Sequence, residues 1–159
     1  MPTGRSLRVV LDTSPLIVLS KLGLLREGIE LFGEAEIPTG VLREVVRKED
    51  SVSSEVLQYV REGLIKVEKK EEEFPRIGLG ESSAISLALE RRKTVVLDDK
   101  RARRIARELG LTVLGSLSIL KKLVRENPKM SLNTLYWRLI EIGFYVDRRL
   151  FDELFSDLR

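Results

Sequence analysis

The chain has 159 residues, enough for one domain, with 28 Lys and Arg against 25 Asp and Glu and a formal net charge of +3. Hydrophobic residues make up 43% and charged residues 33%, a balance that excludes a disordered tail and a membrane protein and indicates a soluble globular fold. The absence of Cys and His excludes disulfides, thiol nucleophiles, zinc-thiolate sites and any imidazole base or ligand. Hydrolytic chemistry would therefore depend on carboxylates and a hard, oxygen-binding cation.

The N-terminal segment MPTGRSLRVVLDTS has neither an apolar signal core nor a small-residue cleavage site. The longest nearly apolar run, 15–25, is far shorter than the roughly 20 residues that cross a bilayer. We therefore expect a cytoplasmic protein with no membrane contact. The abundance of Lys, Arg and Glu, with few Asn and Gln, is typical of a thermophile.

Short apolar runs alternate with segments of helical periodicity, which predicts an α/β fold with three layers, α/β/α, around a short parallel sheet. The predicted strands are 7–11, 35–38, 64–67, 94–97 and 112–114. The predicted helices are two short ones within 16–32, then 39–48, 53–63, 81–92, 100–109 and 116–127, and two C-terminal helices after Met130. Ser14 is expected to be the N-cap of the first helix, with Pro15 at the first helical position.

Most of the aromatic residues fall in the predicted C-terminal helices. They are Tyr136, Trp137, Phe144, Tyr145, Phe151 and Phe155. They either close the core or form a surface for a partner.

Two predicted strands end in a carboxylate, because the sequence VVLD occurs both at 9–12 and at 95–98. In parallel α/β sheets the ligand crevice lies beyond the carboxyl ends of the strands, so we expect Asp12 and Asp98 to face it. Taken alone, each Asp is better explained as the start of a turn or as a helix cap. The paired occurrence favours a functional site.

Two glutamates extend this acidic set. Glu81 falls on the apolar face of helix 81–92, where its carboxylate needs a partner, although a Glu in a first helical turn also favours the helix dipole. Glu44 lies at the edge of the apolar stripe of helix 39–48. Two like charges about 4 Å apart repel by on the order of 4 kcal/mol at an effective dielectric near 20, so converging acids imply a cation. Mg²⁺ or Mn²⁺ suits such a site and can orient a bound water for attack on a phosphodiester.

The segment 91–110 carries eight basic residues against three acidic ones. Such a run beside a metal site suits a polyanion, although a solvated helix face has the same composition. Within this run, we expect Lys100, Arg101, Arg103 and Arg104 to contact the substrate.

Four segments resemble, in order and spacing, the acidic motifs of PIN-domain ribonucleases. They are VVLDTS with Asp12, IPTGVLREV with Glu44, GLGESSAISLALE with Glu81 and TVVLDDKRAR with Asp99. The resemblance covers roughly residues 7–125. It implies a PIN-like nuclease domain at 1–126, with 127–159 as a helical C-terminal extension of the same domain.

The resemblance also implies a metal-dependent endoribonuclease. The implied catalytic residues are Asp12, Glu44, Glu81 and Asp99, and the implied ligands of Mg²⁺ or Mn²⁺ are Asp12, Glu81, Asp98 and Asp99. Ser14 matches a hydroxyl residue that binds a metal water or substrate beside the first Asp, a role that competes with N-capping. Many relatives are VapC-like toxins of toxin/antitoxin pairs, so the implied partners are RNA, a small antitoxin and a second copy of the chain.

The chain departs from the toxin pattern in three ways. Its third acid is Glu81 rather than the more usual Asp, its fourth is doubled by Asp98, and an aromatic helical tail follows. These features are similar to a PIN branch with GLGE and DD motifs. One alternative is a non-catalytic RNA-binding or protein-interaction module on a PIN scaffold. A weaker alternative is a phosphatase or phospho-receiver with Asp12 as an aspartyl nucleophile.

Overall fold

The computed structural model describes residues 7–158, so the first six residues of the predicted domain 1–126 and the last of the extension 127–159 lie outside it. Its centre is a five-stranded, all-parallel sheet in the order β3-β2-β1-β4-β5. The strands are β1 (Arg8–Leu11), β2 (Glu34–Pro38), β3 (Ile65–Glu68), β4 (Thr94–Val96) and β5 (Val113–Leu114). The predicted parallel sheet is confirmed, with strand ends that differ by at most one residue.

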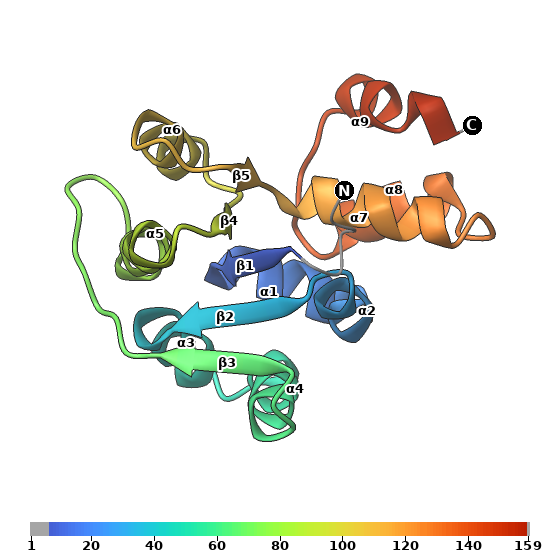
Figure 1. Cartoon of the computed structure of the whole chain (residues 1–159). Helices are drawn as coiled ribbons and strands as arrows, with labels where there is room; N and C mark the ends of the chain where they lie inside the picture. Colours follow the sequence, from blue (N-terminus) through green and yellow to red (C-terminus); the bar gives the residue numbers. More distant parts are fainter. Residues whose placement is uncertain (1–6, 159) are drawn as a thin grey trace.

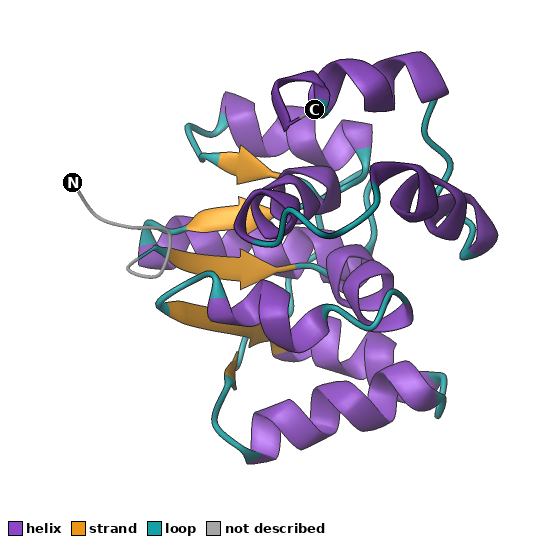
Figure 2. Ribbon diagram, turned by 90° about the vertical axis from the view of Figure 1, so that its right-hand side faces the viewer, coloured by secondary structure: helices purple, strands orange, loops and turns teal. Residues whose placement is uncertain are grey.

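Helices cover both faces of this sheet. They are α1 (Thr13–Lys21), α2 (Leu25–Glu30), α3 (Thr39–Arg47), α4 (Ser51–Arg61), α5 (Leu79–Arg91), α6 (Lys100–Glu108), α7 (Ser116–Glu126), α8 (Leu132–Glu141) and α9 (Arg148–Leu154), followed by the 3₁₀ turn η2 (Ser156–Leu158). Helices α5 and α6 lie on one side of the sheet, and α1, α2 and α7 lie on the other (Figure 1). Figure 2 shows the strands between these two helical layers, which confirms the three-layer prediction. No helix within residues 7–158 is long and apolar enough to cross a membrane.

The sheet order reverses between β1 and β4, which places the topological switch point at their carboxyl ends. In the register of these two strands Val10 pairs with Val95 and Leu11 with Val96. The Asp12 backbone N–H then donates to the Val96 carbonyl at 3.1 Å. The repeated VVLD sequence is therefore offset by one residue in space, so that Asp98 lies one position beyond the level of Asp12.

Helix α1 begins two residues earlier than the sequence predicted. Asp12 has the extended backbone of the N-cap position, Thr13 is the first helical residue and Ser14 is the second. The prediction of Ser14 as N-cap and Pro15 at the first helical position is therefore wrong. Pro15 is tolerated at the third position because its N–H would lack an intrahelical partner there in any case. This shift frees the Ser14 hydroxyl for a contact across the sheet.

The C-terminal helices close the core with part of their aromatic set. Tyr136 packs edge-on against Phe151 at 5.2 Å between ring centroids, and Phe151 stacks on Phe155 at 4.5 Å. All three side chains are buried, whereas Trp137 is 58% exposed and Tyr145 is 80% exposed. Core closure is therefore confirmed for these three buried residues, and a surface for a partner stays a prediction.

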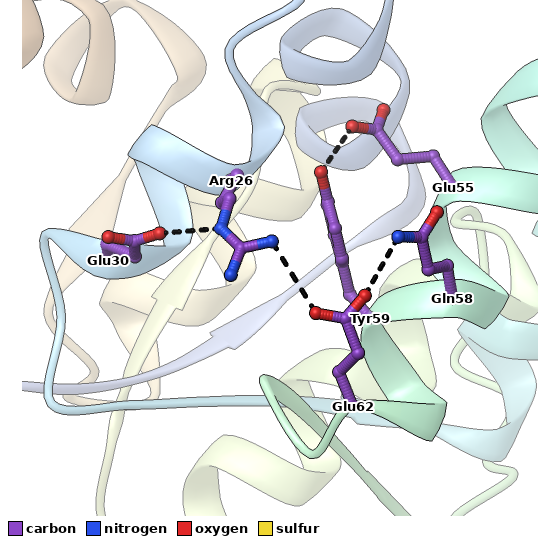
Figure 3. Close-up of polar contacts among 6 residues, drawn as sticks. All are labelled: Arg26, Glu30, Glu55, Gln58, Tyr59 and Glu62. Carbon is purple, nitrogen blue, oxygen red and sulfur yellow. Dashed lines mark hydrogen bonds and ion pairs between the residues drawn. The ribbon is translucent and has the colours of Figure 1, made fainter.

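A polar network joins α2 to α4 where these helices lead into β2 and β3 (Figure 3). Arg26 pairs with Glu30 at 3.0 Å and with Glu62 at 3.5 Å, and the Tyr59 hydroxyl donates to Glu55 at 2.8 Å. The network lies near the amino ends of the strands. It therefore supports the scaffold at the edge opposite the switch point.

Candidate functional site

Asp12 is the buried centre of the acidic site. It follows β1 directly, its residue is 3% exposed, and its Oδ1 atom has no hydrogen-bond partner. Burial raises the pKa of Asp12 to about 8, and the nearby carboxylates of Glu81, Glu44 and Asp98 add to this effect, while the Thr13 backbone opposes it. A buried carboxylate oxygen without a donor is costly, so this atom needs a proton or a cation.

Glu44 is held between the first turns of two helices. The Thr13 hydroxyl of α1 donates to Glu44 Oε2 at 2.7 Å, and the Gly80 backbone N–H of α5 donates to Oε1 at 2.9 Å. Helix α3 carries Glu44 on the side that packs against α5. The predicted position of Glu44 among the acids is therefore supported by contacts that the sequence did not reveal, namely Thr13 and Gly80.

Glu81 has its partner at the start of its own helix. The backbone N–H of Gly78, the N-cap of α5, donates to Glu81 Oε1 at 3.0 Å. Burial raises the pKa of Glu81, and the charges of Asp99 and Glu44 raise it further, while the Gly78 hydrogen bond lowers it. Glu81 therefore both caps α5 and contributes charge to the site, so the two interpretations of its position are compatible.

The two consecutive aspartates after β4 have different surroundings. Asp98 accepts hydrogen bonds from the Ser14 hydroxyl at 2.8 Å, the Ser116 backbone N–H at 2.8 Å and the Ser116 hydroxyl at 2.6 Å. Asp99 is exposed and caps α6, where its Oδ2 accepts from the Ala102 N–H at 3.0 Å. Asp98 thus joins β4 to α1 and α7, whereas Asp99 stands at the open side of the site beside Glu81.

Of the four predicted metal ligands, only Asp12 has a buried oxygen atom without a hydrogen-bond partner. Among residues 7–158, no three Asp, Glu, His or Cys side chains stand close enough together to hold a metal ion as they lie. The predicted ligands Glu81, Asp98 and Asp99 each accept hydrogen bonds from protein donors. Asp12 Oδ1 is the exception, because it is buried, unpartnered and close to three further carboxylates. A divalent cation at Asp12 would satisfy this atom and offset the repulsion among the acids.

A pocket of about 350 Å³ opens over Asp12 and is lined also by Ser14, Glu44 and Glu81. The wall of this pocket also has an apolar part, which comes partly from the segment between α8 and α9, including Phe144. Sequence reasoning missed the contribution of this segment, because no motif marks it and more than 100 residues separate it from Asp12. The only signal was the richness of the tail in aromatic residues.

A second pocket, of about 470 Å³, also has Glu81 in its lining. It is lined by Asp99 together with Lys100, Arg101 and Arg76, and the Arg101 guanidinium donates to the Arg76 carbonyl at 3.1 Å. Two of the predicted substrate contacts, Lys100 and Arg101, therefore stand beside the acids. Arg76 was missed because it lies in the loop between β3 and α5, which has no regular pattern.

The rest of the basic run does not form one continuous face. The Arg103 guanidinium donates to the Leu97 carbonyl at 3.1 Å, and neither Arg103 nor Arg104 lines either of these two pockets. Lys93 is buried and its Nζ lies 3.0 Å from Glu36 Oε1, while Arg91 pairs with Glu68 at 2.9 Å. The basic run 91–110 therefore does not form one common surface for a polyanion, and of its basic residues only Lys100 and Arg101, at the start of α6, line the second pocket.

Comparison with known proteins agrees with this architecture. The PIN domain family (DUF3368) matches residues 8–159, a span that includes the C-terminal helices. Two similar solved structures are a PilT N-terminus domain protein, SSO1118, from the hyperthermophilic archaeon Sulfolobus solfataricus P2, and a domain of a functionally unknown protein from Methanocaldococcus jannaschii DSM 2661. No curated protein matches the chain.

The Sulfolobus structure has 18% sequence identity and a TM-score of 0.52, and the match covers 73% of this chain and 92% of that one. The Methanocaldococcus domain has 18% identity and a TM-score of 0.49, covering 69% and 91%. At this identity the Sulfolobus structure supports the fold alone. PIN domains are typically nucleases, and the family match spans nearly the whole chain. The chain belongs to the PIN domain family.

Proposed function

We propose that this protein is a metal-dependent endoribonuclease that hydrolyses RNA phosphodiesters with Mg²⁺ or Mn²⁺. The observation that carries the proposal is the unpartnered, buried Oδ1 atom of Asp12 at the switch point of the sheet. The nearby charges of Glu44, Glu81 and Asp98 raise the cost of leaving this carboxylate ionised without a cation.

Each acidic residue has a role in this proposal. Asp12 holds the cation, with Glu81 and Asp99 on the open side of the site and Glu44 facing it from α3. When bound, the cation supplies an activated water and neutralises charge on the leaving oxygen. Asp98 fixes the relative position of β4, Ser14 and α7 through its three hydrogen bonds.

Lys100 and Arg101 attract and orient the phosphates of the strand. Both side chains are exposed and line the pocket that contains Glu81 and Asp99. Because cations near a phosphate raise local substrate concentration, binding should fall steeply with salt.

The test is cleavage of a mixed single-stranded RNA pool with Mn²⁺, with Mg²⁺ and with EDTA. Asp12→Asn keeps the shape of the side chain but removes its charge, so we expect metal-dependent cleavage to disappear while the circular dichroism spectrum is unchanged. Glu73→Gln, which removes an exposed acid from the loop before α5, is the matched control and should cleave as the wild type does. Equal cleavage by wild type and Asp12→Asn, or cleavage that persists in EDTA, would overturn the proposal.

A second candidate is a non-catalytic RNA-binding module. The supporting observation is that Glu44, Glu81, Asp98 and Asp99 all accept hydrogen bonds from protein donors, as structural acids do. Such a module would bind RNA with strong salt dependence and leave it intact with either metal.

A toxin role, with a small antitoxin and a homodimer, extends the first proposal. The exposed apolar side chains Trp137, Tyr145 and Leu150 on the C-terminal segment offer a surface for such a contact. Growth arrest on expression, relieved by Asp12→Asn, is the result expected of a toxin. Light scattering of the purified chain tests the dimer.

A further inference from the structure

The apolar wall of the pocket over Asp12 has no role in holding a cation. Besides the acids, this pocket is lined by Ile17 and Val18 of α1 and by Ile142 and Phe144 beyond α8. These apolar residues and the carboxylates therefore line one space of about 350 Å³, which is open to solvent. A pocket whose lining is partly acidic and partly apolar, with one aromatic residue, suits a ligand with both kinds of surface.

The position of Phe144 is fixed by the end of α8. Gly143 has φ +89°, its N–H donates to the Ile140 carbonyl at 3.0 Å, and the Phe144 N–H donates to the Leu139 carbonyl at 2.9 Å. These two hydrogen bonds form a Schellman motif, which requires a left-handed residue that glycine adopts without strain. Phe144 is partly buried against the core, so its ring lies at a defined place in the pocket wall.

The basic residues Lys100 and Arg101 line the neighbouring pocket. Glu81 lines both pockets, so the space beside Phe144 and the space beside Lys100 and Arg101 are neighbours that share this carboxylate. A nucleic acid strand has parts that match both pockets, since its anionic phosphates suit the basic residues and each unpaired base has an apolar face that suits Phe144.

We propose that an RNA strand crosses the site with its phosphates against Lys100 and Arg101 and one unpaired base in the pocket beside Phe144. This inference rests on the proposed RNA substrate, and it adds a way in which the site distinguishes single-stranded from paired RNA. Phe144 is then the residue that selects single-stranded over paired RNA, because a base in a duplex must leave its stack to reach the ring.

The experiment measures binding rather than cleavage. A 5′-fluorescent decauridylate RNA is titrated with the full chain in EDTA, followed by fluorescence anisotropy over a series of salt concentrations. The variants are Phe144→Leu, which removes the ring but keeps an apolar side chain, and Phe144→Trp, which keeps an aromatic face. Trp137→Leu is the matched control, because it removes an exposed aromatic ring that does not line the pocket.

Phe144→Leu should weaken binding roughly 5- to 100-fold, the range expected when one stacked base is lost, with no change in the salt slope. Phe144→Trp should retain the affinity, and Trp137→Leu should stay within about twofold of wild type. Lys100→Gln should instead reduce the salt slope by about one. For an RNA duplex of the same length, Phe144→Leu and wild type should bind alike. Circular dichroism verifies that each variant is folded.

The inference is overturned if Phe144→Leu and Trp137→Leu weaken binding of the single strand equally. It is also overturned if Phe144→Leu changes the affinity for the single strand and for the duplex by the same factor, or if the single strand does not bind at all. Failure of the nuclease proposal is distinguishable, because these measurements need no cleavage. A protein that cuts RNA without any dependence on Phe144 retains the nuclease proposal and loses this one. A protein that binds through Phe144 but never cuts retains this one alone.

Discussion

The backbone N–H of Gly80 donates to Glu44 Oε1 at 2.9 Å, which connects the first turn of α5 to the middle of α3. A Cβ atom at Gly80 would lie 2.5 Å from Glu44 Oε2, so only glycine leaves room for this contact. The GLG sequence before Glu81 therefore brings a backbone donor close to a second carboxylate, in addition to starting a helix.

Gly80→Ala should displace the Glu44 carboxylate from both of its donors. Hydrogen bonds to a charged group contribute about 1.5–3 kcal/mol, and the higher helix propensity of alanine offsets up to about 1 kcal/mol. We expect a net loss of about 1–2 kcal/mol in the free energy of unfolding, measured by urea denaturation. In a Glu44→Ala background the same change should cost nothing, and an equal cost in both backgrounds would contradict the proposed contact.

The stability of the metal-free protein should fall as the pH rises. The folded pKa of Asp12 is about 8 against 3.8 for the unfolded chain, so the folded state binds the extra proton between these values. The stability from this proton is fully present below pH 3.8 and is lost as the pH rises towards 8. Its slope within the window is about −1.4 kcal/mol per pH unit. Urea denaturation in EDTA should show this slope as the difference between wild type and Asp12→Asn. Parallel pH profiles of the two proteins would refute it.

Removal of the Ser116 hydroxyl should destabilise the link between β4 and α7. Ser116 is fully buried and its hydroxyl donates to Asp98 at 2.6 Å, so Ser116→Ala leaves that carboxylate with one donor fewer. We expect a loss of about 1–3 kcal/mol in thermal or urea denaturation. Ser118→Ala, two residues further along α7, is the control and should change stability by less than about 0.5 kcal/mol. Similar losses in the two variants would argue against the Asp98 link.

The buried pair of Lys93 and Glu36 should be sensitive to the loss of one partner. Their side chains are 6% and 1% exposed, and Glu36 Oε2 already lacks a hydrogen-bond partner. Lys93→Met leaves a buried carboxylate without its cation, and we expect about 3–5 kcal/mol of destabilisation. Lys66→Met, which removes an exposed partner of Glu34, should cost less than about 1 kcal/mol. Adding Glu36→Leu to Lys93→Met should recover most of the loss, and failure to recover would show that packing, not charge, sets the cost.

The strand ends were the most predictable part of the site. Because Asp12 and Asp98 follow buried runs, and parallel strands place such ends at one edge, their proximity followed from pattern alone. The one-residue offset between the two VVLD segments did not follow, because backbone pairing rather than sequence similarity sets the register. For the same reason, the sequence could not assign different contacts to Asp98 and Asp99.

The hydrogen-bond partners of the acidic side chains were less predictable than the positions of these residues in the fold. Glu44 and Glu81 were placed at the site by helix periodicity and by motif, but their donors are a hydroxyl and two backbone groups at the starts of α1 and α5. Such contacts depend on where a helix begins. The start of α1 lies two residues before the predicted one, and this changed the role of Ser14. Lys93 belongs to the basic run 91–110, yet the turn before β4 buries it against Glu36, a contact that composition alone could not reveal.

The pocket over Asp12 joins residues far apart in the sequence, with Asp12 directly after β1 and Phe144 beyond α8. During synthesis the carboxylates that line the pocket are therefore made before Ile142 and Phe144. A nascent chain that stops before residue 142 has the carboxylates but lacks part of the apolar lining. In our proposal such a chain could not yet hold an unpaired base.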